Sequence, residues 1–163
     1  MNKRRLLIGA AIVAVTATWY FFRPELLFID QTVSEAFPAG GRGPSDGAQP
    51  TVLATGRFHS VAHESRGVAT IYQLSGGKRL LRLTDFETSN GPAVYVYLVA
   101  AKDAEDSATV RNADTIDLGP LKGNKGDQNY ELPPHAEPAR YQAVTIWCRR
   151  FSVNFATAPL IQP

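Results

Sequence analysis

The chain is organised around its last long apolar run, Tyr141-Gln-Ala-Val-Thr-Ile-Trp-Cys-Arg-Arg-Phe-Ser-Val-Asn-Phe155. It contains the only cysteine, Cys148, and one of the two tryptophans, Trp147. Four consecutive β-branched or aromatic residues precede the cysteine, a composition that suits a pleated and mostly buried strand. We therefore expect a core β-strand at this place.

The hydrophobic pattern of this run changes phase at Cys148. Before the cysteine, the apolar residues on its own face have even numbers, whereas from Phe151 to Phe155 the apolar residues have odd numbers. An uninterrupted strand would send these two sets to opposite faces, because side chains alternate along a strand. The chain is thus expected to change course at Arg149 and Arg150. No glycine, asparagine or proline is present there, which favours a bulge or bend over a two-residue turn.

Shorter runs with a period of two follow one another from residue 51 onward. The strand candidates are residues 68–74, 79–86, 93–101, 115–118 and 130–132. Gly76-Gly77 between the first two predicts a hairpin, and the charged residues 102–109 predict a short helix or a loop. With about seven or eight short strands and no strong helix, the chain is predicted to form an all-β domain, an antiparallel β-sandwich or barrel, preceded by one N-terminal transmembrane helix.

The N-terminus has the features of a signal anchor. Lys3-Arg4-Arg5 precedes an uncharged run of 17 residues, 6–22, which is near the lower limit for crossing a bilayer. A cleaved signal peptide with its core at residues 6–14 is the alternative. The run continues into Trp19-Tyr20-Phe21-Phe22, and such an interfacial aromatic belt favours a retained anchor. The basic N-terminus predicts a single-pass protein of the cell membrane whose other residues lie on the extracytoplasmic side, periplasmic or extracellular.

These features divide the chain into three parts. We expect a membrane anchor at residues 1–23, a juxtamembrane segment with a Pro/Gly-rich linker at 24–50, and a β-domain at 51–163. Apolar residues recur at spacings of three and four in residues 25–37, which is compatible with a short amphipathic helix. A poorly ordered stem explains the same residues equally well, so both interpretations stay open.

Charge and cysteine content exclude several classes of protein. Residues 1–23 contain four basic residues and no acidic one, so the remainder has 17 − 4 = 13 basic and 15 acidic residues. The basic excess therefore belongs to the membrane end, and nothing indicates a nucleic-acid surface. A single cysteine excludes an intrachain disulfide, a Cys-x-x-Cys redox motif and a multi-cysteine zinc site.

Several ordered motifs carry a family resemblance. They are Gly56-Arg-Phe with His63 and Gly67, Leu80-Leu-Arg-Leu-Thr-Asp-Phe86, Asn90-Gly-Pro-Ala-Val-Tyr-Val-Tyr-Leu98, Leu118-Gly-Pro-Leu-Lys-Gly-Asn-Lys-Gly-Asp-Gln-Asn-Tyr-Glu-Leu-Pro133 and Val144-Thr-Ile-Trp-Cys-Arg-Arg-Phe-Ser-Val153. Together they resemble the DM-thirteen domain, also called the electron-transfer DM-thirteen domain, from about residue 51 to residue 161. The family is β-rich and occurs beside DOMON domains in animal cell-surface proteins and as small membrane-tethered units in bacteria. The resemblance implies a role in electron transfer, with the single cysteine as a thiol or as a ligand to a prosthetic group.

Cys148, Arg149 and Arg150 form the candidate redox site. A thiolate is favoured beside cations, and an unpaired cysteine outside the cytoplasm calls for an explanation. The competing interpretation is that the cysteine is a small buried hydrophobe, as free cysteines usually are. The cofactor is unknown: haem or copper could bind through Cys148, although nothing in the sequence requires either and no separate metal site is predicted.

A second candidate site is the polar segment that follows residue 121. It contributes Lys122, Asn124, Lys125, Asp127, Gln128, Asn129 and Tyr130. The segment is either a ligand-binding loop or a surface loop whose amide and carboxylate side chains cap their own backbone. It has neither the ending of a phosphate-binding loop nor the spacing of a calcium loop.

The leading hypothesis is a membrane-anchored, extracytoplasmic domain with an electron-transfer or thiol-redox role centred on Cys148. It would act as an electron-transfer component rather than as an independent enzyme. The alternative is a non-catalytic β-sandwich module that binds a small ligand, a sugar or an envelope protein. The expected partners are the membrane, through residues 6–22, and a redox or envelope protein, with no nucleic acid.

Overall fold

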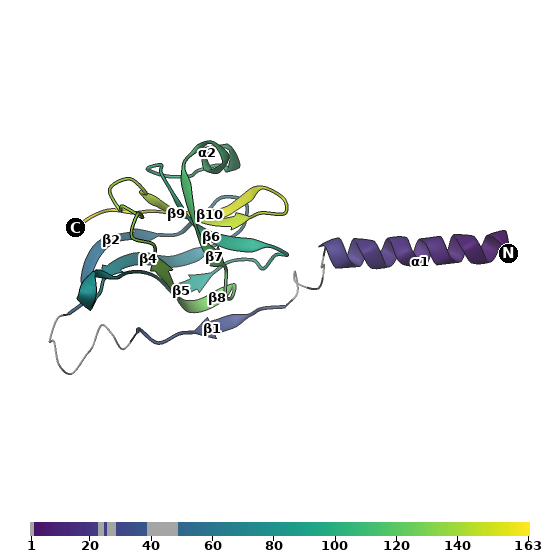
Figure 1. Cartoon of the computed structure of the whole chain (residues 1–163), viewed down its shortest axis with the longest axis horizontal. Coiled ribbons are helices and arrows are strands. Elements are labelled where there is room, and N and C mark those ends of the chain that lie inside the picture. The colour runs from purple at the N-terminus through teal and green to yellow at the C-terminus, as the bar shows by residue number, and fades with distance from the viewer. Residues whose placement is uncertain (1, 23–24, 26–28, 39–48) are drawn as a thin grey trace.

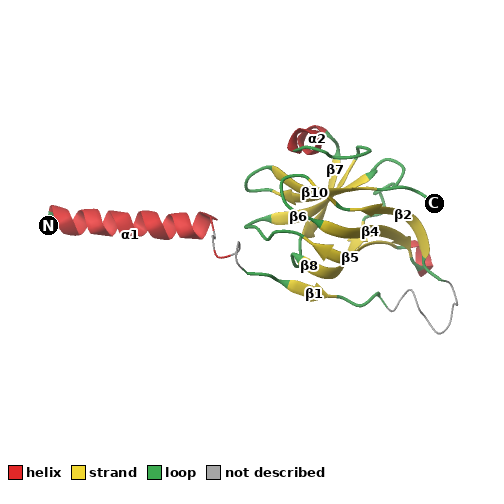
Figure 2. Cartoon of the chain, turned by 180° about the vertical axis from the view of Figure 1, so that it is seen from behind, coloured by secondary structure: helices red, strands yellow, loops and turns green. Residues whose placement is uncertain are grey.

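The computed structural model describes residues 2–22, 25, 29–38 and 49–163. It shows one long N-terminal helix, α1 (Lys3–Phe22), that projects from a β-sandwich (Figure 1). The C-terminus lies at the end of the sandwich away from α1, as the view from behind also shows (Figure 2). The side chains of α1 make no buried surface with the sandwich. Its length and composition suit either a membrane anchor or a signal sequence.

Two five-stranded sheets make up the sandwich. The first contains, in spatial order, β1 (Thr32–Ser34), β8 (Lys125–Leu132), β5 (Arg79–Glu87), β4 (Arg66–Gln73) and β2 (Thr51–Arg57). The second contains β3 (His59–Ser60), β10 (Val153–Pro159), β9 (Ala143–Cys148), β6 (Val94–Val99) and β7 (Thr115–Pro120). The predicted all-β class and the sandwich are thus confirmed, with ten strands in the described part of the chain, and the barrel alternative is wrong because the sheets stay open.

The hairpin predicted at Gly76-Gly77 is present. β4 and β5 pair in antiparallel register from Gln73 opposite Arg79 onward, and the short 3₁₀ turn η3 (Ser75–Gly77) joins them. Both glycines have positive φ angles, 78° and 79°. Residues with a Cβ rarely adopt this conformation, so the turn requires glycine.

The predicted change of course after Cys148 is a full chain reversal. Residues 149–152 form a four-residue turn, and the register places Cys148 opposite Val153 in the β9–β10 hairpin. The preference for a bulge or bend at Arg149-Arg150 is therefore wrong. A four-residue loop needs no Asn-Gly pair. Within this turn, Ser152 has a left-handed backbone conformation, with φ 52°. The irregularity of this hairpin lies further on, between Asn154 and Ala156.

Residues 29–37 contain the short strand β1 and no helix, so the amphipathic helix considered for residues 25–37 is not formed there. Residues 26–28 lie outside the described part. β1 pairs in parallel with β8, with Val33 opposite Gly126. A Cβ on Gly126 would lie 2.0 Å from the carbonyl oxygen of Val33, and its φ is +96°. Only glycine permits this approach, so the strand edge of β8 is shaped to receive β1. Of the predicted linker, residues 39–48 lie outside the described part.

A short helix covers part of the outer face of the second sheet. α2 (Ser107–Asn112) begins at Asp106, whose carboxylate caps the backbone N–H of Thr109. This helix is the short element predicted for residues 102–109, displaced toward the C-terminus. Trp147 packs beneath it with Val110 and is only 7% exposed. The sandwich core therefore has a small satellite cluster outside β9.

Candidate functional site

Cys148 is the last residue of β9 and is fully buried, with 0% of its surface exposed. Its strand partners are Val94 on β6 and Val153 on β10. It belongs to the main apolar core, together with Phe155. The structure therefore surrounds the thiol with aliphatic and aromatic groups at one end of the sandwich.

Arg149 is held on the outer face of the sheet, away from the core side of Cys148. Its guanidinium carbon lies 3.6 Å from the centre of the Tyr95 ring, and its Nε donates a 2.6 Å hydrogen bond to the hydroxyl of Tyr97. It also forms an ion pair with Asp117. The hydrogen bond to Tyr97 is the main reason why the pKa of Arg149 is raised above its usual value. The guanidinium of Arg149 is thus bound to Tyr95, Tyr97 and Asp117.

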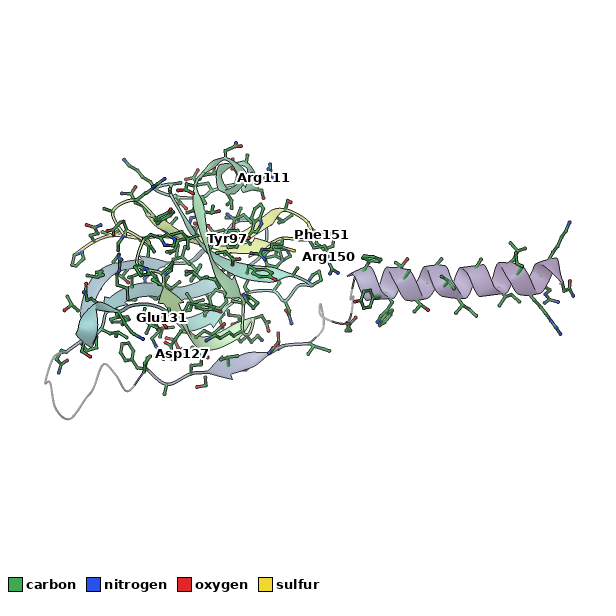
Figure 3. The ribbon with its side chains drawn as sticks, in the orientation of Figure 1. Tyr97, Arg111, Asp127, Glu131, Arg150 and Phe151 are labelled. Atoms are coloured by element: carbon green, nitrogen blue, oxygen red, sulfur yellow. The ribbon has the colours of Figure 1, made fainter. Side chains whose placement is uncertain are left out.

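Arg150 and Phe151 occupy the tip of the β9–β10 turn, at the end of the sandwich nearer to α1 (Figure 3). Arg150 is exposed and Phe151 is 48% exposed. The two arginines therefore follow the thiol directly in sequence but diverge in space, one to the outer face and one to the turn. This follows from strand alternation combined with the chain reversal. A catalytic role for the three residues stays a prediction.

A metal or haem ligand set does not fit the surroundings of Cys148. Both strand partners of the cysteine are valines, which offer no ligand atoms. Among the described residues, no group of three or more histidine, cysteine, aspartate and glutamate side chains is placed to hold a metal ion. We therefore derive no chemistry through haem or copper.

The second candidate segment is mostly strand β8, and its buried members bind one another. The amide oxygen of Gln128 accepts hydrogen bonds from the backbone N–H groups of Lys122 and Gly123, and its nitrogen donates to the Gly123 carbonyl at 2.7 Å. The Tyr130 hydroxyl donates to the same amide oxygen at 2.9 Å. Gln128 is 0% exposed. The Gln128 side chain therefore links the turn at residues 122–123 to strand β8.

Burial also changes the acidity of Tyr130. Desolvation raises the pKa of its hydroxyl to about 12, because ionisation would place a charge in an apolar environment. The ammonium of Lys122 lies 5.1 Å from the ring centre and pairs with Glu35 at 2.7 Å. Tyr130 is therefore a neutral structural hydrogen-bond donor at physiological pH.

Three further members of the segment hold the juxtamembrane residues against the sandwich. Asn124 accepts a hydrogen bond from the backbone N–H of Gln31 at 2.7 Å. The backbone carbonyl of Asp127 accepts from the N–H of Glu35 at 3.0 Å, and the side-chain amide of Asn129 donates to the carbonyl oxygen of Ala36. The side chains of Asp127 and Asn129 also accept from the guanidinium of Arg82. The segment was predicted as either a ligand-binding loop or a surface loop that caps its own backbone, and its ligand binding stays a prediction. Much of its polarity serves the attachment of residues 30–36.

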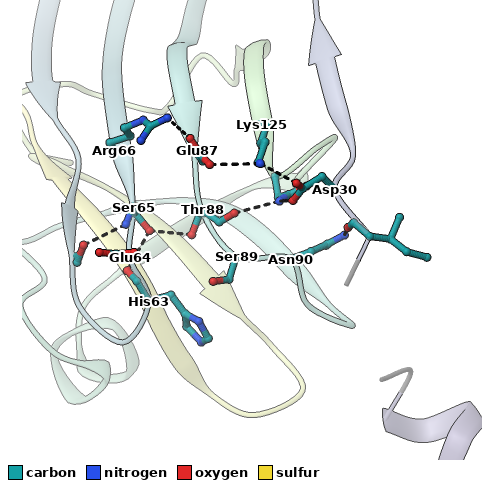
Figure 4. A pocket seen from close by; sticks show the side chains of 13 residues that line it. Asp30, His63, Glu64, Ser65, Arg66, Glu87, Thr88, Ser89, Asn90 and Lys125 are labelled. Carbon is teal, nitrogen blue, oxygen red and sulfur yellow. Dashed lines mark hydrogen bonds and ion pairs between the residues drawn. The ribbon is translucent and has the colours of Figure 1, made fainter. Parts of the chain in front are cut away.

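Asn124 and Lys125 also line a pocket of about 700 Å³ at one end of the sandwich (Figure 4). His63 lies in the same lining, and its ring centre is 3.8 Å from that of Phe155. Burial lowers the pKa of His63. In the sequence, His63 belongs to one of the family motifs, and that motif gave no signal of a pocket. The pocket forms from loops that are distant in sequence, so only the fold brings them together.

The fold and the sites define a class: a two-sheet β-sandwich with one buried thiol at the end of a core hairpin. Residues 57–160 match the family described as Electron transfer DM13, which is 104 of the 163 residues of the chain. The chain therefore belongs to the DM13 family, as the sequence motifs predicted. No curated protein and no solved structure matches it.

Proposed function

We propose that this protein is an electron-transfer component tethered to the outer face of a membrane, with Cys148 as its redox group. Membership of the electron-transfer DM13 family is the observation that carries the proposal. The chain offers one cysteine to that chemistry. The match places the chain in an electron-transfer family, whereas the membrane anchor and the redox role of Cys148 are proposed.

The position of Cys148 at the end of β9 supports a redox role. The thiol is buried, but it is the last residue of its strand and directly precedes the exposed turn 149–152. Strand ends open more readily than strand centres, with a free energy below that of global unfolding. Opening of the turn would let a redox partner, a one-electron oxidant, reach the sulfur. The thiol would release its proton to water and pass one electron to the partner, which leaves a thiyl radical that regains an electron and a proton on reduction.

Alkylation of the folded protein tests this idea. We expect iodoacetamide to label Cys148 under native conditions, at a rate that changes little with low concentrations of denaturant, because local opening exposes little new surface. The matched control is Ile146→Cys in a Cys148→Ala background, since Ile146 lies on the same face, 0% exposed, in the middle of β9. The control should be labelled only through global unfolding.

The outcomes separate a redox thiol from a packing thiol. If Cys148 and the control cysteine show the same rate and the same steep denaturant dependence, the thiol is core and the proposed role fails. If Cys148 labels faster, Arg150→Ala should then slow the labelling, because the exposed arginine would stabilise the thiolate in the open state. Cys148→Ser should abolish electron transfer while the fold remains.

The proposed topology has its own test. Lys3-Arg4-Arg5 precedes an apolar helix with an aromatic end, so the positive-inside rule puts the sandwich outside. Protease added to intact cells or spheroplasts should digest the sandwich while the N-terminus stays in the membrane. Protection of the sandwich, or a mature N-terminus near Thr18, would contradict the retained and outward-facing form.

A further inference from the structure

The pocket at the end of the sandwich is built by four separate parts of the chain. Residues 63–66 come from the connection into β4, residues 87–90 from the end of β5, Asn124 and Lys125 from the start of β8, and residues 29–30 from the juxtamembrane segment. Figure 4 shows these side chains around one concave space. Its volume of about 700 Å³ is in the range of small-molecule sites.

Both cations of the lining are paired with carboxylates, and one carboxylate is in excess. The carboxylate of Glu87 lies between Arg66 and Lys125, and the Lys125 ammonium lies 2.6 Å from Asp30 and 3.3 Å from Glu87. The hydrogen bond to Asp30 is the largest cause of the raised pKa of Lys125. With Glu64 included, the lining holds three carboxylates and two cations. An anion such as phosphate would therefore meet no unpaired positive charge.

The remaining lining groups are uncharged donors and acceptors beside a flat surface. The hydroxyls of Ser65 and Thr88 are hydrogen bonded to each other at 2.7 Å, and Asn90 donates to the carbonyl of Ile29. The imidazole of His63 is tilted by 36° against the ring of Phe155. Sugar rings are recognised by this combination, because hydroxyls pair with carboxylates, amides and hydroxyls while the C–H face of the ring packs on a flat side chain.

We propose that this pocket binds a neutral sugar ring, with His63 as the packing surface and the Glu64, Ser89 and Asn90 side chains as hydrogen-bonding groups. The site is distinct from Cys148 and does not depend on the proposed electron transfer. Ile29 is seven residues from Phe22, the last residue of α1, so the pocket mouth lies within roughly 25 Å of the end of the helix. Both a soluble glycan and the sugar headgroup of a membrane lipid can supply this chemistry at that distance.

Saturation-transfer difference NMR on the full chain tests the proposal, because this method detects weak ligands. The chain is held in phospholipid nanodiscs or in a detergent without a sugar headgroup. The probes are glucose, N-acetylglucosamine and cellobiose, with inorganic phosphate and ethylamine as the anionic and cationic comparisons. We expect a sugar signal with a dissociation constant near about 1–10 mM, the scale for a ligand of one or two rings.

Three variants locate the binding. Ser89→Trp should abolish the signal by filling the pocket, and His63→Ala should weaken binding roughly fivefold through the lost packing surface. Gln73→Ala is the control, because Gln73 is exposed at the far end of β4 and outside this pocket. Circular dichroism verifies that each variant is folded. Cys148→Ala should bind sugar unchanged, so failure of the electron-transfer proposal would not affect this one.

Several results would overturn the sugar proposal. These are a signal for phosphate or ethylamine instead of the sugars, a sugar signal that persists in Ser89→Trp, and no signal for any of the three sugars at about 50 mM, well above the expected dissociation constant. A second arm separates the two sources of the ligand. Nanodiscs that contain a glucosyl lipid should compete with free glucose if the headgroup reaches the pocket, and should leave the glucose signal unchanged if only soluble glycans bind.

Discussion

The β9–β10 hairpin and strand β8 both contribute buried residues, but these residues are buried for opposite reasons. All six residues of β9 are buried, and apolar side chains fill its core face. In β8 the buried positions include Gln128 and Tyr130, and every hydrogen-bonding group of the Gln128 side chain is used within its own segment. Packing contacts are enough to stabilise a buried apolar side chain, whereas a buried amide is stable only when its hydrogen-bond partners are present.

This difference bears on the two candidate sites that the sequence predicted, Cys148 with its neighbours and residues 122–130. The polar side chains of residues 122–130 are mostly bonded within the fold. This includes Asn124 and Lys125, which line the pocket but are bonded to residues 30, 31, 87 and 88. The thiol of Cys148 gives the reverse lesson, because a lone cysteine suits an apolar core without any chemistry. Substitutions in β9 and in β8 should separate these two kinds of burial.

The largest effect is expected for Trp147→Ala. Trp147 is 7% exposed and packs with Ala104 and Val110 under α2, so truncation should lower the free energy of unfolding by about 3–5 kcal/mol. Denaturant unfolding followed by circular dichroism measures it. Ile161→Ala, at a side chain that is 72% exposed, should change stability by less than about 0.5 kcal/mol. A loss below about 1 kcal/mol for Trp147→Ala would place the residue on a functional surface instead.

Gln128→Leu addresses the polar segment with little change in volume. It removes the acceptor for two backbone N–H groups, at Lys122 and Gly123, and the donor to the Gly123 carbonyl. We expect a loss of about 2–4 kcal/mol, because buried polar groups are left without partners. Glu131→Gln is the matched control in the same strand, since the Glu131 side chain is 70% exposed; its effect should be under about 0.5 kcal/mol. Equal effects for the two variants would disprove the structural role of Gln128.

Tyr130 makes stability depend on pH in the alkaline range. Its pKa is raised to about 12 in the folded protein, against about 10 in the unfolded chain. The unfolded chain therefore releases its proton first, and stability falls as the pH rises from about 10 to about 12, by about 2–3 kcal/mol in total. Unfolding measured across this range should show a flatter pH dependence for Tyr130→Phe than for the native chain. Parallel curves for both proteins would rule out Tyr130 as the cause.

The smallest effect is expected for Thr145→Val, and it has the opposite sign. Thr145 is 0% exposed, and its hydroxyl has no hydrogen-bond partner among the described residues. A methyl group in its place should raise the free energy of unfolding by about 1 kcal/mol. Thr88→Val is the control, because the Thr88 hydroxyl is buried but bonded to Ser65, and it should lose about 1 kcal/mol. If thermal unfolding shows Thr145→Val to be destabilised as well, a buried water completes its hydrogen bond.

Much of the fold could be predicted from local pattern. The β-branched and aromatic residues before Cys148 predicted β9, and the glycine pair after residue 75 predicted the β4–β5 hairpin, because both signals act through neighbouring residues alone. The turn at residues 149–152 was predicted as a break but not as a reversal. A serine in the left-handed conformation leaves no compositional signal of the kind that glycine leaves.

The all-β class, the burial of β9, the family and the apolar N-terminal helix could all be predicted from the sequence. Their signals are period-two patterns, ordered motifs and one apolar run, which are local properties of the chain. Tertiary structure alone decided that residues 32–34 become the edge strand β1, because this strand needs the close approach that Gly126 allows from nearly a hundred residues away. It also decided that Arg149 binds Tyr95, Tyr97 and Asp117 instead of the thiol. The pocket belongs to this second group, because its lining comes from loops that meet only when the two sheets have packed and β1 has been added.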